Sequence, residues 1–531
     1  MASCWNSQGR NASRNLTTLI YNSGSALDIE ISYVKVTCRK KRPRPHDIRV
    51  HWPVVSMKSW CQFVFKNHPC LLLGGAGYEN RAAWESTFET FWSRYRTIRP
   101  NHCLFSSGKP LRRCIPFVTH GDEGVTHRRV PFMVQSWQPV VSYKGTAFTA
   151  VSGNSFCSRF LFCCMSASAF SGDKTLHELN TAWTEEMLDL FHHGYQDASS
   201  TVYLIWLGCK GDWKYLRSAW YLETGFTSKR KCHLCSSEEW WNPSVEAESR
   251  RSFPGPDPFK PGVRSPFRRL PSCEPSSILV DSAHSFHIKG IGVDWCASCI
   301  VLGCFKGLWG QGSLDAKLER AHKEFQEYCV RERRVTSCDV WSKLKFDMTT
   351  NKSFPLSIAG KGFDTAVCCI WLEDCFTHKD LNADVELGIA LYSLRQINKF
   401  FRTLHASGLW ITAEQQSELQ GLARKFCEGF GQLASRRASA GYRMYKIRPK
   451  MHMFLELTRQ NAGPEWALNC LNASCWNDED FIGRVSSISR SCYGLGISQA
   501  LRTTQRALGR YRVQFRVLRS WNMNDLAAGR R

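Results

Sequence analysis

Residues 114–122 read CIPFVTHGD, a short apolar run that ends in a glycine and an aspartate. Residues 202–212 read VYLIWLGCKGD and end in the same two residue types. Apolar runs of this length, followed by a turn-forming glycine, are typical of buried strands. The two segments therefore predict two core strands, each with a carboxylate, Asp122 or Asp212, at or just past its end.

The residues around these segments complete a pattern of strands and helices. Apolar side chains in residues 175–195 recur at spacings of three and four, which predicts a helix. The other predicted elements are strands at residues 130–137, 160–165 and 278–280 and a short helix at residues 213–221. The order is three strands, a helix, a strand, a helix and a strand, which indicates an α/β fold with a mixed sheet.

The chain beyond this pattern is predicted to be mainly helical. Apolar spacing indicates helices at residues 313–334 and 382–407, and residues 412–415 carry a capping-box pattern that opens another. The tail from Leu501 contains eight arginines and one acid. Its Arg502, Arg506 and Arg510 recur every four residues and predict a phosphate-contacting stripe on a helix; a solvated surface helix is the alternative.

The charge of the chain favours an anionic partner. Among 531 residues, 70 Lys and Arg outnumber 46 Asp and Glu, which leaves a net charge of +24. Such an excess indicates nucleic acid before a membrane surface, although a basic soluble protein without such a partner is the plainer alternative. The longest apolar runs, at residues 160–164 and 299–305, fall far short of the roughly 18 residues of a membrane helix. We therefore expect nucleic acid, specifically DNA, as the partner and no membrane.

The compartment is predicted to be intracellular and reducing. The 25 cysteines are scattered along the chain, and the N-terminal residues lack the basic start and apolar run of a signal peptide. Most cysteines are therefore expected to be small buried hydrophobes. Residues 39–45 read RKKRPRP, which is typical of a nuclear-import signal or of a solvated charged loop. The first interpretation predicts the nucleus.

Two short patterns carry metal chemistry. Asp122 and Asp212 would repel each other if their strands were neighbours, and a divalent cation such as Mg²⁺ removes that cost. Each aspartate alone is more simply a turn or helix-cap residue. Cys232 and Cys235 have the Cys-x-x-Cys spacing of a zinc site, which needs two more ligands. A second such pair, residues 296–299, lies in an apolar run and is interpreted as core.

Taken in order along residues 110–490, these motifs resemble those of RNase H-like DDE/D transposases of the CACTA (EnSpm) group. The segments that carry the resemblance are Gly121–Gly124 with Phe132–Val140, Gly211–Trp213 with Gly225–Cys235, Asp281–His284, and Pro449–His452 with Asp478–Phe481. The resemblance implies an RNase H-like mixed sheet, interrupted by a helical insertion before the final catalytic helix. The predicted regions are residues 1–105, of unclear fold; 106–295, the first part of the core with a Cys-x-x-Cys hairpin; 296–440, the insertion; 441–500, the end of the core; and 501–531, a basic tail.

The resemblance also implies catalytic residues. Asp122, Asp212 and Glu479 would bind two Mg²⁺ or Mn²⁺ ions, and His284 would contact a DNA phosphate or a reacting oxygen. Asp478 and Asp480 flank Glu479, and Asp364 is a further candidate for the third acid. A core histidine is the alternative for His284.

A relative of this family, the V(D)J recombinase, completes its Cys-x-x-Cys zinc site with two histidines. In this chain His452 matches the first, whereas Glu456 stands where the second is expected. Residues four apart share one helical face, and a carboxylate can ligate Zn²⁺. Cys232, Cys235, His452 and Glu456 are therefore the predicted zinc ligands.

The function implied by the resemblance is metal-dependent DNA cleavage followed by strand transfer. Residues 1–100 show no zinc-finger or helix-turn-helix signature, so a catalytically inactive, domesticated or degenerate DNA-binding protein is the alternative. A zinc-stabilised interaction protein is a third reading, and self-association is left open. The arginines predicted to contact DNA are Arg264, Arg268, Arg269, Arg502, Arg506 and Arg510.

Overall fold

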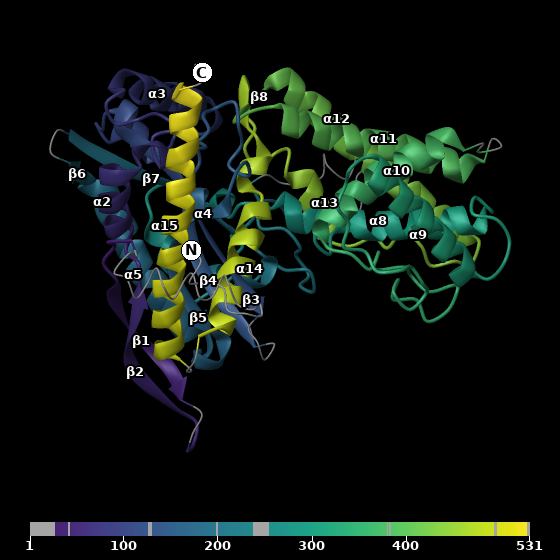
Figure 1. The fold of residues 1–531 in the computed structure, drawn as a ribbon, viewed down its shortest axis with the longest axis horizontal. Helices are drawn as coiled ribbons and strands as arrows, with labels where there is room; N and C mark the ends of the chain where they lie inside the picture. Colours follow the sequence, from purple (N-terminus) through teal and green to yellow (C-terminus); the bar gives the residue numbers. More distant parts are fainter. Residues whose placement is uncertain are drawn as a thin grey trace. The chain divides into compact units, whose positions relative to one another are not determined.

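The computed structural model describes residues 27–40, 43–125, 130–197, 200–236, 254–379, 381, 384–492 and 496–527. The chain forms two compact units (Figure 1). The first unit comprises Met1–Leu222, Phe259–Leu279 and Cys475–Arg531, and the second comprises Glu223–Pro258 and Val280–Ser474. The first unit is therefore assembled from three separate stretches of the chain.

A five-stranded mixed sheet forms the centre of the first unit. Its spatial order is β5-β4-β3-β7-β6. The pairs β3–β4, β4–β5 and β6–β7 are antiparallel, whereas β3 and β7 are parallel. The strands are β3 (Cys114–Val125), β4 (Pro131–Pro139), β5 (Phe160–Ser166), β6 (Tyr195–Asp197) and β7 (Ser200–Gly211). Because β3 and β7 are parallel, their carboxyl ends lie at the same end of the sheet.

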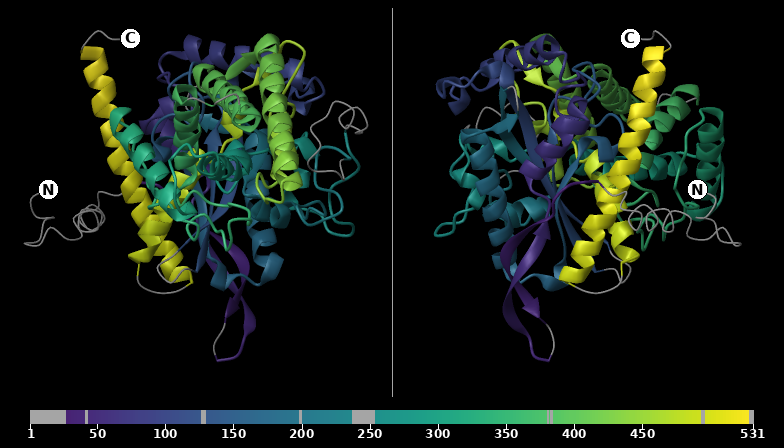
Figure 2. Two further views of the ribbon diagram at one scale, coloured as in Figure 1. Left: turned by 90° about the vertical axis from the view of Figure 1, so that its right-hand side faces the viewer. Right: turned by 60° about the vertical axis from the view of Figure 1, so that its left-hand side comes forward.

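Helices cover both faces of this sheet. Gly121 and Gly124 of β3 are three residues apart and so face opposite sides. A Cβ atom on Gly121 would meet the ring of Tyr215, whereas one on Gly124 would lie 2.0 Å from the Ser486 hydroxyl. Helices α5 (Gly172–His192) and α6 (Trp213–Trp220) cover one face of the sheet (Figure 2). Helices α14 (Trp476–Arg490) and α15 (Ile497–Ala527) cover the other face. Both glycines therefore allow a helix to approach the strand closely.

The sheet helices are held by specific side chains. Trp183 of α5 stacks on Phe162 with ring centroids 4.6 Å apart, and Asn180 accepts a hydrogen bond from Gln135 at 2.7 Å. On the other face, the hydroxyl of Tyr511 donates to the carbonyl of Arg159 at 2.6 Å. The C-terminal helix α15 is thus tied into the sheet rather than being only a solvated basic tail.

The N-terminal part of the first unit adds a hairpin and helices that the sequence did not predict. Strands β1 (Ser32–Lys40) and β2 (His46–Val54) pair antiparallel from Ser32↔Val54 to Lys40↔His46. The helices of this part are α2 (Met57–Asn67) and α3 (Arg81–Ile98), while the short α4 (Ser155–Ser158) lies between β4 and β5. The indole nitrogens of Trp52 and Trp60 donate to carbonyls of β5, so this region is part of the same core.

The second unit is mainly helical. Its central helix α8 (Ile291–Phe305) is almost entirely buried. The remaining described elements are η8 (Ala283–His287), α9 (Leu314–Arg331), α10 (Gly362–His378), α11 (Val385–Ala406), α12 (Ala413–Ser439), α13 (Lys450–Glu456), η9 (Cys470–Ala473) and the short strands β8 (Trp410–Thr412) and β9 (Trp466–Leu468). Residues Ala283–Phe305 are apolar and long enough to cross a membrane, but most of that apolar window is buried in the unit. Helices of soluble protein cores have the same character.

The α/β class is confirmed, with corrections at two predicted strands. The first strand does not end before Gly121 but continues to Val125, because β4 pairs with it as far as Pro131. The predicted strand at residues 278–280 is wrong as an independent strand. It forms a single parallel bridge, Cys209↔Ile278, with one hydrogen bond from Leu279 N to Cys209 O at 2.8 Å. The predicted capping box is confirmed, since Thr412 and Gln415 bond reciprocally at the start of α12.

Candidate metal centres

The register of the sheet relates Asp122, which lies within β3, to Asp212, which directly follows β7. Gly121 of β3 pairs with Gly211 of β7, so Asp122 and Asp212 each follow one member of this pair. An Asp212 carboxylate oxygen accepts a hydrogen bond from Tyr215 N at 2.6 Å and caps α6. Asp122 is buried, and one of its oxygens accepts from Glu123 N at 2.6 Å. The two aspartates therefore emerge from adjacent parallel strands.

Three consecutive acids in the first turn of α14 have different environments. Asp478 is completely buried, whereas Asp480 is exposed and accepts hydrogen bonds from Ser155 at 2.6 Å and Arg484 at 2.8 Å. The carboxylate of Glu479 lies between these extremes, with an oxygen within 4.8 Å of one from Asp122. The structure thus selects Glu479, among the three acids, as the one that joins Asp122.

The pKa of Lys214 responds to the negative charge of the acids near the carboxyl ends of β3 and β7. Its ammonium group pairs with Glu123, and this hydrogen bond is the largest cause of its raised pKa. Asp212 and Asp122 raise the same pKa further through their charges. Both aspartates therefore act on one exposed lysine, which places their negative charge in the same neighbourhood.

The geometry suits a hard divalent cation. Two oxygens bound to one Mg²⁺ at about 2.0–2.1 Å lie roughly 3–4 Å apart. The Asp122 and Glu479 oxygens, within 4.8 Å, need only a small side-chain adjustment to reach that spacing. Asp212 caps α6 in this structure and lies outside the group of close donor atoms that contains Asp122 and Glu479; the strand register relates it to Asp122.

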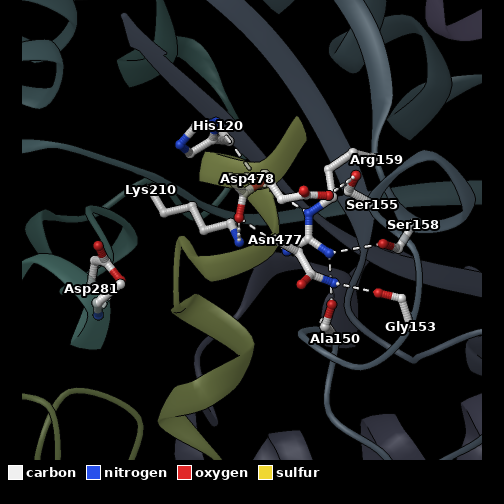
Figure 3. A network of polar contacts seen from close by, with 12 residues as sticks. His120, Ala150, Gly153, Ser155, Ser158, Arg159, Lys210, Asp281, Asn477 and Asp478 are labelled. Carbon is white, nitrogen blue, oxygen red and sulfur yellow. Dashed lines mark hydrogen bonds and ion pairs between the residues drawn. The ribbon is translucent and has the colours of Figure 1, made fainter. Parts of the chain in front are cut away.

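Behind these acids lies a buried ionic network that the sequence analysis missed (Figure 3). Asp478 accepts hydrogen bonds from Lys210 at 2.6 Å and from Arg159 at 3.0 and 3.1 Å. Arg159 also donates to Ala150 O at 2.7 Å. The side chains of Asp478, Arg159 and Lys210 are completely buried. This network attaches the first turn of α14 to β7 and to the segment before β5.

The network shifts the pKa values of its members. Burial alone would raise the pKa of Asp478, but Arg159 and Lys210 outweigh it and hold that pKa well below its usual range. Burial lowers the pKa of Lys210, and lowers that of His120 to about 4, so His120 is neutral at physiological pH. A sequence signal existed: His120 and Lys210 stand two residues before Asp122 and Asp212, and His120 shares a face of β3 with Asp122.

His284, the other predicted catalytic residue, belongs to the second unit. Its Nδ1 lies 2.6 Å from an Asp281 carboxylate oxygen. The two Asp281 oxygens also accept from Ala283 N at 2.8 Å and His284 N at 3.0 Å. Asp281 therefore caps η8 and fixes the orientation of the imidazole, and the role of His284 stays a prediction.

The four predicted zinc ligands converge within the second unit. One donor atom from each of Cys232, Cys235, His452 and Glu456 lies within 4.8 Å of every other, and all four residues are buried. His452 Nε2 is 3.5 Å from the Cys235 sulfur and 3.3 Å from a Glu456 oxygen. Helix α13 positions His452 and Glu456 one turn apart, while the Cys-x-x-Cys turn supplies the two thiols.

This donor set fits Zn²⁺. Bonds of about 2.0–2.3 Å in a tetrahedron separate neighbouring ligands by roughly 3.3–3.8 Å, which includes both short contacts of His452. Burial, Cys235 and Glu456 together raise the pKa of the Cys232 thiol well above its usual value. Such crowding of buried acidic groups is unfavourable without a cation and becomes favourable once a cation binds.

The two remaining metal candidates have structural explanations. Asp364 is buried in the second unit, where it accepts hydrogen bonds from Thr336, from Ser337 and from Lys361 N at the start of α10. Cys296 of the second Cys-x-x-Cys pair lies 3.3 Å from the Cys369 sulfur inside the helical core. Asp364 thus caps the start of α10 in this structure.

The arginines predicted to contact DNA are in varied environments. Arg269 pairs with Glu185 at 2.6 Å, Arg268 stacks over the Phe259 ring at 4.2 Å, and Arg264 donates to the Arg268 carbonyl at 3.3 Å.

On α15, Arg502 is exposed and Arg506 donates to Ser491 O at 2.8 Å. Burial lowers the pKa of Arg510. Arg502 therefore remains the most accessible member of the predicted stripe. The predicted import signal includes residues 41–42, which lie outside the described residues.

Comparison of the chain with models of protein families and with curated proteins finds no match.

Proposed function

We propose that the chain is a transposase-derived DNA-processing protein that cleaves DNA and transfers strands with the help of divalent cations. The observation that carries this proposal is the approach of Glu479 to Asp122, two acids far apart in the sequence. The alignment of Asp212 with Asp122 on adjacent strands supports it. The net charge of +24 supports a polyanionic substrate.

The sheet topology supports an RNase H-like core. The first three strands of the sheet, β3, β4 and β5, form an antiparallel meander, and β7 then lies parallel to β3. The isolated bridge of Ile278 to Cys209 is also parallel, as the pairing of a fifth strand with β7 would be in such a core. In such a sheet the first and fourth strands carry the first two acids, and a later helix, here α14, supplies the third.

The chemistry proposed for this site needs no protein nucleophile. Divalent cations held by Asp122, Glu479 and Asp212 would activate water or a 3′-hydroxyl and stabilise the leaving oxygen. The protein residues would position the cations and the DNA phosphate at the edge of the sheet. Glu479 is partly exposed to solvent, so a cation bound there would be accessible to a DNA phosphate.

The test is nicking of supercoiled plasmid DNA by the full chain in Mg²⁺ or Mn²⁺. We expect Asp122→Asn and Glu479→Gln each to reduce the nicking rate at least about 100-fold, as expected for loss of a metal ligand. Asp480→Asn is the matched control, because Asp480 is the exposed neighbour of Glu479 in α14. We expect this variant to retain the nicking activity of the wild type. A folded wild-type protein that shows no metal-dependent nicking would refute the enzymatic proposal.

The second candidate function is DNA binding without cleavage. It is favoured by the engagement of an Asp212 oxygen in the cap of α6. This function predicts steeply salt-dependent DNA affinity that does not change on Asp122→Asn substitution. The nicking assay and a binding titration at two salt concentrations therefore distinguish the two candidates.

We further propose that Cys232, Cys235, His452 and Glu456 hold a structural Zn²⁺ in the second unit. The support is the buried four-donor cluster with ligand spacings typical of a tetrahedral site. Zinc would join the Cys-x-x-Cys turn to α13, two segments more than 200 residues apart in the sequence.

A further inference from the structure

The first unit contains a cavity of about 470 Å³ whose lining residues belong neither to the acid pair nor to its buried network. Its wall is formed by residues 27–30, by α2 and by α15. The lining residues of each helix recur at spacings of three and four, so each helix presents one face to the cavity. A volume of this size is typical of sites that bind small molecules.

Cationic side chains from both helices line the cavity. Helix α2 contributes Lys66, and α15 contributes Arg512 and Arg516, which are four residues apart. Burial and the charge of Arg516 both lower the pKa of Arg512, so the two guanidinium groups are close enough to repel each other. Lys66 and Arg516 are exposed, and neither forms an ion pair with an acid in the part of the chain that the structure describes. A phosphate group would stabilise these charges by accepting hydrogen bonds from them.

An aromatic cluster supplies the apolar part of the wall. The rings of Phe63 and Phe515 are stacked with centroids 6.3 Å apart, and the His68 ring centroid lies 4.7 Å from that of Phe515. Phe515 is buried, whereas Phe63 is half-buried and therefore offers accessible ring surface. The exposed amide of Gln62 lines the same cavity. An aromatic ring beside an amide suits a nucleobase, which has a flat face for stacking and a hydrogen-bonding edge.

Two acids also line the cavity, and they restrict the ligand further. Asp28 and Glu30 are exposed, and neither forms an ion pair with Lys66 or Arg516. Their charge disfavours a second anionic group on the ligand, but their oxygens can accept hydrogen bonds from the amino group of a base. The cavity therefore suits a ligand with one phosphate and one base better than inorganic phosphate.

We propose that this cavity binds one unpaired nucleotide, with the phosphate at Lys66, Arg512 and Arg516 and the base against Phe63. A base within a duplex is paired and stacked, so it cannot enter such a cavity without leaving the helix. The nucleotide belongs to a single strand of DNA or is a free mononucleotide, and these two sources share the same chemistry. The proposal goes beyond the proposed function, because it does not involve the acid pair.

The experiment compares the affinity of the full chain for single-stranded and duplex DNA without added Mg²⁺ or Mn²⁺. Fluorescence anisotropy measures binding of a short labelled oligodeoxycytidine strand and of a labelled duplex of the same length. Phe63→Leu removes the aromatic ring and is expected to weaken single-strand binding by at least about fivefold, while duplex binding stays within about twofold of wild type. The unchanged duplex affinity also shows that this variant is folded.

A second variant tests the charge of the cavity. Lys66→Gln is expected to weaken single-strand binding about threefold and to reduce the preference for the single strand over the duplex. Lys58→Gln is the matched control, because it makes the same change at an exposed lysine of α2 that pairs with Asp189 and does not line the cavity. The control is expected to keep the single-strand preference of the wild type.

The outcomes separate charge from stacking. If Lys66→Gln changes the single-strand preference no more than Lys58→Gln does, the cavity is not a nucleotide site. If Lys66→Gln reduces this preference but Phe63→Leu does not, the cavity binds phosphate alone and the nucleotide assignment is refuted. A loss of preference in both variants would establish the site.

Competition identifies the source of the nucleotide. Displacement of the labelled strand by deoxycytidine monophosphate, but not by inorganic phosphate at the same concentration, assigns the cavity to free nucleotides. Displacement by unlabelled strand alone assigns it to nucleotides within a strand, and equal displacement by inorganic phosphate would refute recognition of a base. A wild-type protein that nicks no plasmid DNA would refute the proposed function and leave these results unaffected.

Discussion

The acid pair of the first unit and the Cys/His/Glu cluster of the second unit differ in donor atoms and in exposure. Asp122, on the central strand β3, and Glu479, on α14, offer carboxylate oxygens, and Glu479 is partly exposed. The four residues of the second cluster offer sulfur, nitrogen and oxygen, and all are buried. Hard, accessible oxygens suit an exchangeable cation that meets a substrate, whereas a closed cluster with thiolates suits a permanent structural ion.

The comparison also separates two ways to support a site. The acid pair is backed by a network of buried charges that attaches α14 to the sheet. The second cluster is supported by its own ligands, since His452 and Glu456 share α13 and the cysteines share one turn. Disrupting the buried network should therefore alter the position of α14 alone. Disrupting the Cys/His/Glu cluster should instead remove the link between the Cys-x-x-Cys turn and α13.

The largest expected effect is the loss of the closed site. Cys232→Ser should abolish stoichiometric zinc and destabilise the second unit by at least about 3 kcal/mol, because the metal contributes directly to folding. Zinc content by mass spectrometry and hydrogen exchange across α13 measure both effects. Cys103→Ser, at a partly exposed cysteine of the first unit, is the control. Equal zinc content and stability in the two variants would rule out the zinc site.

The next effect concerns the support of the open site. Arg159→Met should lower the free energy of unfolding by about 2–4 kcal/mol, because Ala150 O and Asp478 lose a buried charged donor. Arg269→Met, which breaks the exposed pair with Glu185, should cost at most about 1 kcal/mol. Urea unfolding compares the two. Similar losses would mean that the buried network contributes no more than a surface ion pair.

A smaller effect tests the unusual fourth ligand. Glu456→Ala should weaken zinc binding by at least about tenfold, whereas Glu456→His, which restores a two-histidine site, should retain it. Competition with a chromophoric chelator gives the affinities, and Co²⁺ absorption reports the coordination of each variant. An unchanged affinity in Glu456→Ala would show that Glu456 is not a ligand.

The smallest expected effect is a pH dependence that belongs to neither metal site. Burial raises the pKa of Glu186 to about 7 from 4.5, although Met57 N donates a hydrogen bond to its carboxylate at 2.7 Å. The folded state therefore binds this proton more tightly, and stability decreases as pH rises from about 4.5 to about 7.

Glu186→Gln keeps the acceptor for Met57 N and should remove this decrease. The variant is expected to be about 1 kcal/mol more stable than wild type at pH 8 and equal to it at pH 4, after allowance for the exposed part of the side chain. Urea unfolding of zinc-loaded protein across this range measures the difference. A parallel pH profile for both proteins would assign the dependence to other groups.

The strands and helices with clear periodicity were predictable, and so was the alignment of two acids. The apolar runs of residues 114–122 and 202–212 predicted β3 and β7. The observed register pairs Gly121 with Gly211, the residues that precede Asp122 and Asp212. The β1–β2 hairpin was missed because its charged and apolar residues alternate weakly. The segment at 278–280 was overestimated, since only Ile278 reaches the neighbouring strand.

The contents of the sites were predictable in part. Cys-x-x-Cys spacing and the i, i+4 spacing of His452 and Glu456 identified the zinc candidates locally. The choice among Asp478, Glu479 and Asp480 was not local, because it depends on which side of α14 meets the sheet. The burial of Arg159 and Lys210 was likewise hidden, since a single basic residue in an apolar run gives no sign of its distant partner.

The discontinuity of the first unit determines the order in which the molecule is completed during synthesis. Its sheet strands end by Gly211, but α14, which carries Glu479, begins only at Trp476. At about 5–20 residues per second, a ribosome needs on the order of tens of seconds to bridge this interval. The second unit lies within that interval, so it is synthesised before the first unit is complete. A nascent chain therefore carries two of the three acids but has no complete acidic site until its final helices are made.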